Sequence, residues 1–151
     1  MTEDRVLVTV GSASFPKLIT ACSAWEGNIQ VQWGTGAPCK RHPGFSFSSN
    51  FDDHLNRADV VVSHAGAGTV FTLLQLNKAF VVVPNVERFD QHQIDLAQYL
   101  REEKLCAVYD VYSFAKISQN EVCSAAKHLA AERCYTPSEF DIDAFLRIFW
   151  Q

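Results

Sequence analysis

The stretch that decides the fold is Val60-Val61-Val62-Ser63-His64-Ala65-Gly66-Ala67-Gly68-Thr69. It opens with the short apolar run that is typical of a buried strand, and a helical pattern follows its two glycines. Glycines let the backbone pass close to a bound group, and a helix start offers unpaired N–H donors and the positive end of the helix dipole. The stretch predicts either a phosphate-binding turn or a turn that only joins a strand to a helix.

Strand and helix patterns alternate along the rest of the chain. Strands are predicted at 5–10, 28–33, 45–47, 60–63, 80–84 and 106–109, and helices at 16–25, 50–57, 91–103, 121–133 and 141–150. Pro16 is expected in the first turn of its helix and Asn50 as the N-cap of the next. The alternation predicts one α/β domain over residues 1–151, a Rossmann-like parallel sheet with helices on both faces.

Three predicted loops share the edge where ligands of such sheets bind, beyond the carboxyl ends of the strands. They are residues 11–15, 64–69 and 85–93. The first lacks GxGxxG and the second lacks the GK[ST] end of a Walker motif, so neither an NAD site nor a P-loop is predicted. The third contains Gln91-His92-Gln93, which either hydrogen-bonds sugar hydroxyls or belongs to a solvated helix cap.

Composition narrows the class of ligand. The chain has 151 residues, of which 48% are hydrophobic, and a formal net charge of -4. Nucleic-acid binders usually carry a basic face, so a small phosphate such as a nucleotide fits better than a polymer. The five cysteines are widely spaced and form no CxxC pair, which predicts buried thiols in a reducing compartment rather than disulfides or zinc ligands.

Three segments resemble the donor-binding, C-terminal domain of glycosyltransferase family 28. They are Val8 to Ser12, Ala58 to Thr69 and Asp90 to Ala97, in the order and spacing of that family. The chain is most similar to its short members, the small subunits of the dolichol-linked UDP-N-acetylglucosamine transferase and of bacterial exopolysaccharide glycosyltransferases. The resemblance implies the fold of the C-terminal half of a GT-B glycosyltransferase, which needs no metal or other cofactor.

The resemblance also implies a function. It implies transfer of a hexose or N-acetylhexosamine from a UDP-sugar, with UDP-N-acetylglucosamine favoured, to a lipid-linked sugar acceptor. Because the chain supplies only one half, a membrane-anchored partner subunit would bind the acceptor and hold the chain at the cytosolic face of a membrane. The C-terminal helices, about 118–151, are expected to be available for packing on that partner, and no nucleic acid is expected.

Site residues carry over from the family position by position. The donor diphosphate is assigned to two turns, which contain Gly11, Ser12, Gly66, Ala67, Gly68 and Thr69. The uracil and ribose are assigned to Phe51 and Thr72 on two helices, and the sugar is assigned to Gln91, His92 and Gln93 in the third loop. Catalysis is assigned to His64, and no metal ligand is expected.

Two alternatives remain open from the sequence. Thr72 and Gln75 stand where the family commonly has acidic residues, which favours a non-catalytic binding or enhancer subunit that stabilises a partner glycosyltransferase. An enzyme on a related fold, such as a UDP-sugar epimerase, would carry both halves in one chain, and a length of 151 residues argues against it.

Overall fold

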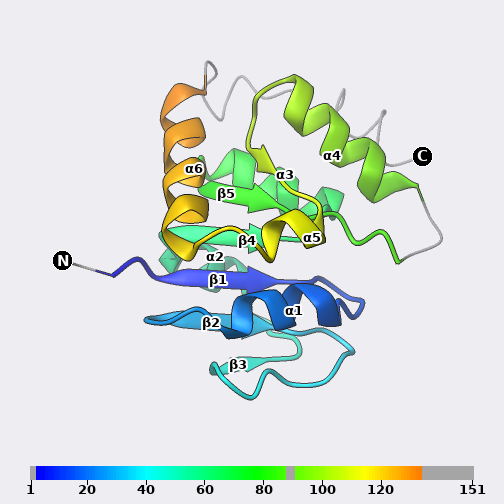
Figure 1. Cartoon of the computed structure of the whole chain (residues 1–151), viewed down its shortest axis with the longest axis vertical. Helices are drawn as coiled ribbons and strands as arrows, with labels where there is room; N and C mark the ends of the chain where they lie inside the picture. Colours follow the sequence, from blue (N-terminus) through cyan, green and yellow to red (C-terminus); the bar gives the residue numbers. More distant parts are fainter. Residues whose placement is uncertain (1–2, 88–90, 134–151) are drawn as a thin grey trace.

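A computed structural model of the chain describes residues 3–87 and 91–133, which form a parallel sheet between two layers of helices (Figure 1). The strand order is β3-β2-β1-β4-β5-β6, and every neighbouring pair is parallel. The strands are β1 (Val6–Thr9), β2 (Ile29–Gln32), β3 (Gly44–Phe45), β4 (Val60–Ser63), β5 (Ala79–Val82) and β6 (Ala107–Val108). The predicted α/β class and parallel sheet are confirmed.

The centre of the sheet is built from the apolar runs of β1 and β4. Val8 of β1 stands between Val31 of β2 and Val62 of β4, and all three side chains are fully buried. Successive side chains of a strand point to opposite faces, so Val8 joins one core while Leu7 joins the other. Both faces are therefore covered, as continuous apolar strands require.

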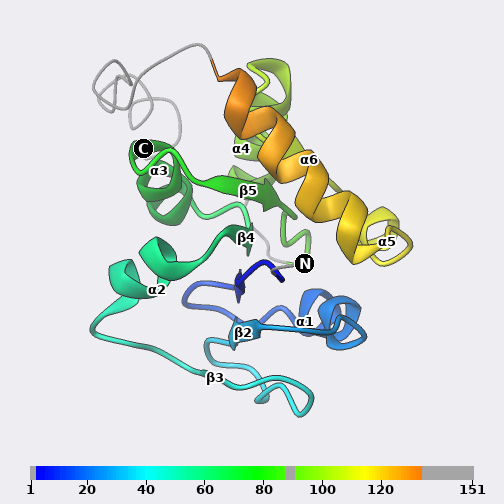
Figure 2. The ribbon, with the colours of Figure 1, turned by 90° about the vertical axis from the view of Figure 1, so that its left-hand side faces the viewer.

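The helices are divided between the two faces of the sheet, which Figure 2 views from a second side. Phe15, Leu18 and Phe114 belong to the core of one face, and Leu55, Leu73 and Leu96 belong to the core of the other. The first layer contains α1 (Pro16–Ser23), α5 (Val111–Phe114) and α6 (Gln119–Glu132), and the second contains α2 (Phe51–Arg57), α3 (Ala67–Gln75) and α4 (His92–Glu102). Within the two described ranges, no helix is long and apolar enough to cross a bilayer.

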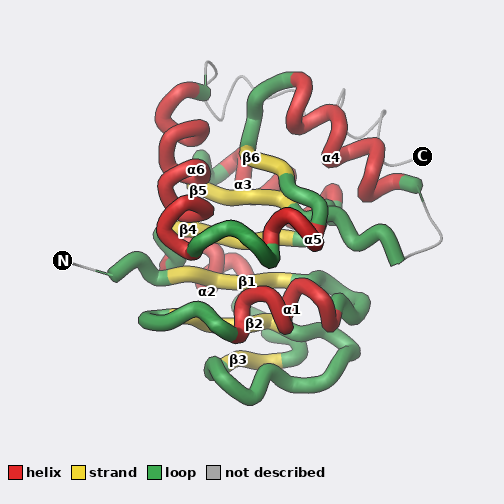
Figure 3. Tube along the Cα trace, viewed as in Figure 1, coloured by secondary structure: helices red, strands yellow, loops and turns green. Residues whose placement is uncertain are grey.

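Several element boundaries differ from the prediction. The short strand β3 is Gly44–Phe45 rather than 45–47, because its register is set by pairing with Val31 and Gln32 of β2. The segment between β2 and β3 is loop throughout, as predicted (Figure 3). Helix α1 begins at Pro16 as expected but already ends at Ser23. The helix predicted at 141–150 lies outside the described residues.

One helix was not predicted, and the N-cap predicted at Asn50 is confirmed in position but not in its side-chain hydrogen bond. Helix α5 was not predicted, and it begins after Asp110, whose carboxylate accepts a hydrogen bond of 2.9 Å from the Ser113 amide. Asn50 occupies the position before α2, but its side chain makes no capping hydrogen bond. Its carbonyl oxygen instead accepts the first bond of the helix, from the Asp53 amide at 3.0 Å.

The cysteines are mostly buried thiols, as predicted. Cys22, Cys106 and Cys123 are buried and free, and burial raises the pKa of the Cys106 thiol to about 12. Cys39 departs from the prediction because it is only half-buried, in the loop between β2 and β3. Cys134 lies outside the described residues.

Candidate functional site

The three loops singled out in the sequence meet at the carboxyl edge of the sheet. The Asn85 side-chain amide donates to the Ser14 carbonyl oxygen at 3.0 Å, which joins the loop after β5 to the loop after β1. The Ala65 amide donates to Gln93 Oε1 at 3.2 Å, which joins the turn after β4 to helix α4. The prediction that these loops lie together is confirmed.

The turn after β4 leads directly into the N-terminus of α3. Gly66 occupies the N-cap position with an extended backbone (φ -85°, ψ 125°), and no side chain caps the helix there. The first N–H bonded back within this turn is that of Val70, which reaches the Gly66 carbonyl at 2.9 Å. The N–H groups before it lack a carbonyl partner within the helix, so this end can receive an anion.

The His64 imidazole lies between two glycines. A methyl group added to Gly11 would come within 2.6 Å of His64 Cε1, and one added to Gly66 would come within 2.8 Å of the same atom. The His64 side chain is buried, and the His64 amide donates to the Thr9 carbonyl at 3.1 Å. Gly11, His64 and Gly66, predicted from separate motifs, therefore form one contact group.

Gln32 holds the first glycine turn and was not predicted as a site residue. Its Oε1 accepts hydrogen bonds from Thr9 Oγ1 at 2.7 Å and from the amides of Val10 and Gly11, both at 3.0 Å. The Gly11 N–H is therefore already used, and any backbone donors to a diphosphate in this turn come after Gly11. A polar residue in a strand covered on both faces was the sequence signal that could have identified Gln32.

Gln93 and Asn85 join the other two loops. Gln93 Oε1 accepts from the amides of Ala65 and Asn85, at 3.2 and 2.9 Å, and both side chains are buried. The role of Gln93 in sugar binding stays a prediction. Its side-chain oxygen already holds the turn after β4 through the bond from Ala65. Asn85 was not predicted individually, because its partners lie far away in the sequence.

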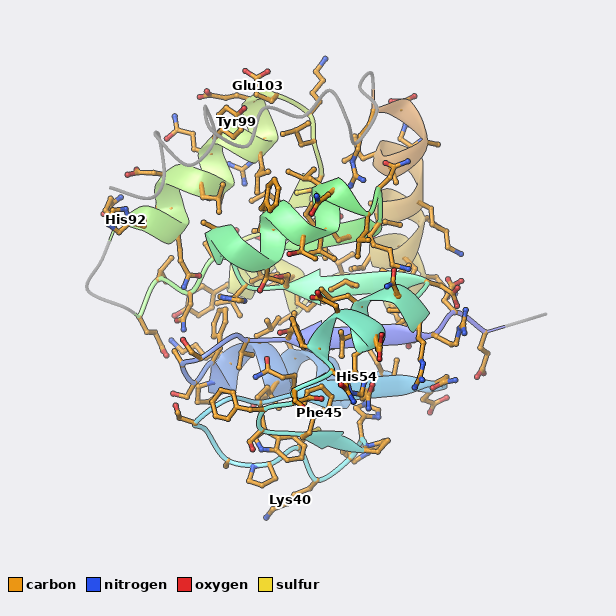
Figure 4. All side chains as sticks on the ribbon, turned by 180° about the vertical axis from the view of Figure 1, so that it is seen from behind. Lys40, Phe45, His54, His92, Tyr99 and Glu103 are labelled. Atoms are coloured by element: carbon orange, nitrogen blue, oxygen red, sulfur yellow. The ribbon has the colours of Figure 1, made fainter. Side chains whose placement is uncertain are left out.

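The remaining predicted ligands of the sugar lie at the start of α4. Gln91 and His92 are exposed, and Figure 4 shows His92 at the outer end of α4, pointing away from the sheet. A hollow of about 460 Å³ opens further along α4, between this helix and the ends of β5 and β6, and neither Gln91 nor His92 lines it. Its wall includes Gln98 and Arg101, whose side chains can hydrogen-bond a polar group.

The predicted uracil and ribose residues are placed on α2 and α3. Phe51 is the first residue of α2 and is half-buried against the core of that face. Thr72 lies in the second turn of α3, where its hydroxyl donates to the Gly68 carbonyl at 3.1 Å. The Thr72 hydroxyl can still accept a hydrogen bond but has no free proton to donate.

A metal site is not assembled within residues 3–87 and 91–133, where no three His, Cys, Asp or Glu side chains come together. His54, which stands next to Asp52 and Asp53 in the sequence, has structural contacts instead. Its ring lies 4.4 Å from that of Phe45, and its Nδ1 is 3.1 Å from Gln30 Oε1 (Figure 4).

A parallel sheet covered by helices on both faces, with a glycine turn and a helix N-terminus at its carboxyl edge, belongs to the Rossmann-like class of α/β domains. Residues 5–139 match the glycosyltransferase family 28 C-terminal domain. The chain therefore belongs to this family, as the resemblance in three sequence segments implied.

Two relatives are named as subunits of a UDP-N-acetylglucosamine transferase. The chain is 33% identical over 76 residues to the UDP-N-acetylglucosamine transferase subunit ALG13 of Candida albicans. The matched region covers 50% of the chain and 26% of that protein. It is 40% identical over 116 residues to ALG13 of Yarrowia lipolytica, and this matched region covers 63% of the chain and 59% of that protein. The chain thus spans less than two thirds of either relative.

A solved structure confirms the fold. The chain superposes on MurG of Acinetobacter baumannii with a TM-score of 0.67 and 17% identity, over 98% of the chain and 51% of MurG. An identity this low supports the fold alone. The predicted equivalence to one half of a GT-B glycosyltransferase is confirmed.

Proposed function

We propose that the chain is the donor-binding subunit of a UDP-sugar-dependent glycosyltransferase, with UDP-N-acetylglucosamine as the favoured donor. The observation that carries this proposal is the convergence of Gly11, His64 and the uncapped N-terminus of α3 at one edge of the sheet. The Candida and Yarrowia relatives are UDP-N-acetylglucosamine transferase subunits, which supports the choice of donor.

The proposed reaction displaces UDP from the anomeric carbon of the sugar. Negative charge then builds up on the leaving diphosphate, and fixed N–H groups at the start of α3 would stabilise it without reorganising. Ser12 and the first turn of α3, from Ala67 to Thr69, would meet the diphosphate, while Gln91 and His92 would address the sugar. Phe51 and Thr72 would lie on the uracil and ribose side.

His64 is our candidate for the general base that deprotonates the acceptor hydroxyl. A neutral imidazole at the sheet edge suits this role, since histidine is the side chain that most often transfers protons in catalysis. The test is turnover of the assembled complex with His64→Ala, compared with the exposed α6 residue in His128→Ala as a control. A large loss with the first variant alone is expected, and unchanged turnover would remove His64 from the mechanism.

The acceptor-binding half is proposed to be a separate, membrane-anchored subunit that presents a lipid-linked sugar. It would hold this chain at the cytosolic membrane face. The test is copurification of the chain with such a subunit, followed by transfer assays with a panel of UDP-sugars. UDP-N-acetylglucosamine should give the fastest transfer, and a different preferred sugar would refute the donor assignment.

A non-catalytic enhancer role is the second candidate, and the contacts of Thr72 favour it. The Thr72 hydroxyl donates to the Gly68 carbonyl. Position 72 has no carboxylate that would hydrogen-bond a ribose. Titration of UDP by calorimetry separates the two functions. Binding to the chain or its complex supports the transferase subunit, whereas undetectable binding to both would leave the enhancer role.

A further inference from the structure

Gln32 is a fully engaged polar side chain in a buried strand, next to the proposed diphosphate site. Its side chain is 3% exposed, so it cannot itself touch a donor. We infer that Gln32 is a positioning residue, which fixes the Gly11 turn in the conformation that donor binding requires. The inference depends on the proposed function for the identity of the ligand.

The side-chain oxygen of Gln32, Oε1, accepts hydrogen bonds from three donors at the end of β1. The Thr9 hydroxyl lies at 2.7 Å, and the Val10 and Gly11 amides lie at 3.0 Å each. Because a strand ends here, the Gly11 amide would otherwise face the loop without a strand partner. The Gln32 oxygen supplies that partner and continues the hydrogen bonding of the sheet by one residue.

The side-chain nitrogen of Gln32, Nε2, donates both of its protons. It donates to the Gly11 carbonyl at 2.8 Å and to the Ser46 carbonyl at 2.7 Å. The orientation of the side-chain amide follows from this network, since one end meets only donors and the other only acceptors. Ser46 belongs to the segment that leads into α2, so Gln32 also ties the diphosphate side of the proposed site to the Phe51 side.

Gly11 is where such an anchor matters most. Its φ of 73° lies in the left-handed region, and glycine moves freely between this region and others. Gln32 bonds both the N–H and the C=O of Gly11 and thereby restricts rotation on either side of its Cα. The His64 ring is packed against Gly11, so a shift of this turn would also displace the candidate base.

Packing alone does not explain a glutamine here. The neighbouring strand residue Val31 is fully buried with an apolar side chain, as the sheet interior favours. A buried amide is costly unless its hydrogen bonds are made, and Gln32 makes five, each to the end of β1 or to the segment after β3. Its contacts therefore serve the geometry of the carboxyl edge.

The test is Gln32→Glu, which keeps the shape and replaces the NH2 group by an oxygen. At high pH the introduced carboxylate faces the carbonyl oxygens of Gly11 and Ser46 and repels them. At low pH the protonated carboxyl donates to one of them. The affinity of the variant for UDP, relative to that of the wild type, should therefore fall as the pH rises through the pKa of the introduced carboxyl. We expect a loss of about tenfold or more at pH 8 and a smaller loss at pH 5, measured by calorimetry.

The matched control is Gln30→Glu, on the same strand and next to His54 instead of Gly11. It should leave the pH dependence of UDP affinity unchanged. A second readout is the amide NMR signal of Gly11 in the full chain, which should shift and exchange faster in Gln32→Glu but not in Gln30→Glu. This readout also separates positioning from simple charge repulsion of the diphosphate.

Thr9→Val provides a milder variant should Gln32→Glu fail to fold. It removes one of the five hydrogen bonds and should weaken UDP binding by less, with a smaller shift of the Gly11 signal. Wild-type affinity at both pH values together with an unmoved Gly11 signal would overturn the inference. Absence of UDP binding by the wild-type complex would instead refute the proposed function, while the Gly11 signal still tests the anchoring.

Discussion

At the scale of single residues, the two glycines around His64 are required for different reasons. Gly11 has a φ of 73°, which most residues adopt only with strain, whereas Gly66 has an extended φ of -85° that any residue can adopt. The nearest obstacles to a side chain at Gly66 are the atoms of the His64 imidazole. The two positions can therefore be separated by substitution.

We predict that Gly66→Ala destabilises the protein by about 1–3 kcal/mol, because the added methyl overlaps the buried ring of His64. The same substitution in a His64→Ala background should cost almost nothing, since the obstructing ring is gone. Urea denaturation of the four proteins in this double-mutant cycle measures the coupling. Additive costs would show that the approach of His64 is not the reason for glycine at this position.

At the scale of helices and strands, the sequence predicts best the elements that are decided locally. The valine runs of β1 and β4 and the proline at the start of α1 placed these elements within a residue or two. The helix α5, from Val111 to Phe114, is too short to show a helical period. Its only local sign was Asp110, which bonds the amide of Ser113.

The candidate site was predictable in part for the same reason. The glycine turns and His64 are visible as motifs, because a strand, a turn and a helix follow one another there. Gln32 and Asn85 were missed because their partners lie 21 residues away at Gly11 and 71 residues away at Ser14. A polar residue in a buried strand, such as Gln32, is visible in the sequence, but no local pattern shows which distant residues its side chain will hydrogen-bond.

Helix α6 provides a test of local capping. The Ser118 hydroxyl accepts a hydrogen bond of 3.2 Å from the Glu121 amide at the start of this helix. We predict that Ser118→Ala lowers the free energy of unfolding by about 1 kcal/mol, because an amide at the helix end loses its partner. Thermal and urea denaturation measure the change.

The control for this prediction is Ser124→Ala, at an exposed position within the same helix. Alanine is the better helix former there, so the stability should stay equal or rise slightly. Equal losses in both variants would show that the cap contributes nothing specific.

At the scale of the whole molecule, three buried amide side chains join loops from distant parts of the chain. Gln32, Asn85 and Gln93 connect the ends of β1, β4 and β5 and the start of α4. The carboxyl edge is thereby a preorganised framework within this one chain, before any partner is added. Preorganisation of this kind lowers the entropic cost of binding a ligand.

We predict that sugar transfer by the assembled complex is independent of divalent cations. The charge of the leaving diphosphate would be met by backbone N–H groups and the α3 dipole, which chelators do not remove. Transfer rates measured with and without excess EDTA should agree within about twofold, a change of less than 1 kcal/mol in the barrier. A loss restored by Mg²⁺ or Mn²⁺ would contradict this prediction.

The two outer strands of the sheet, β3 and β6, are each two residues long in the described part of the chain. An edge strand can pair with a strand of another chain through its unpaired main-chain N–H and C=O groups. A strand of two residues has too few such groups to hold another strand. We therefore expect this fold to resist growth of its sheet into aggregates and to recognise other proteins through side chains rather than by strand addition.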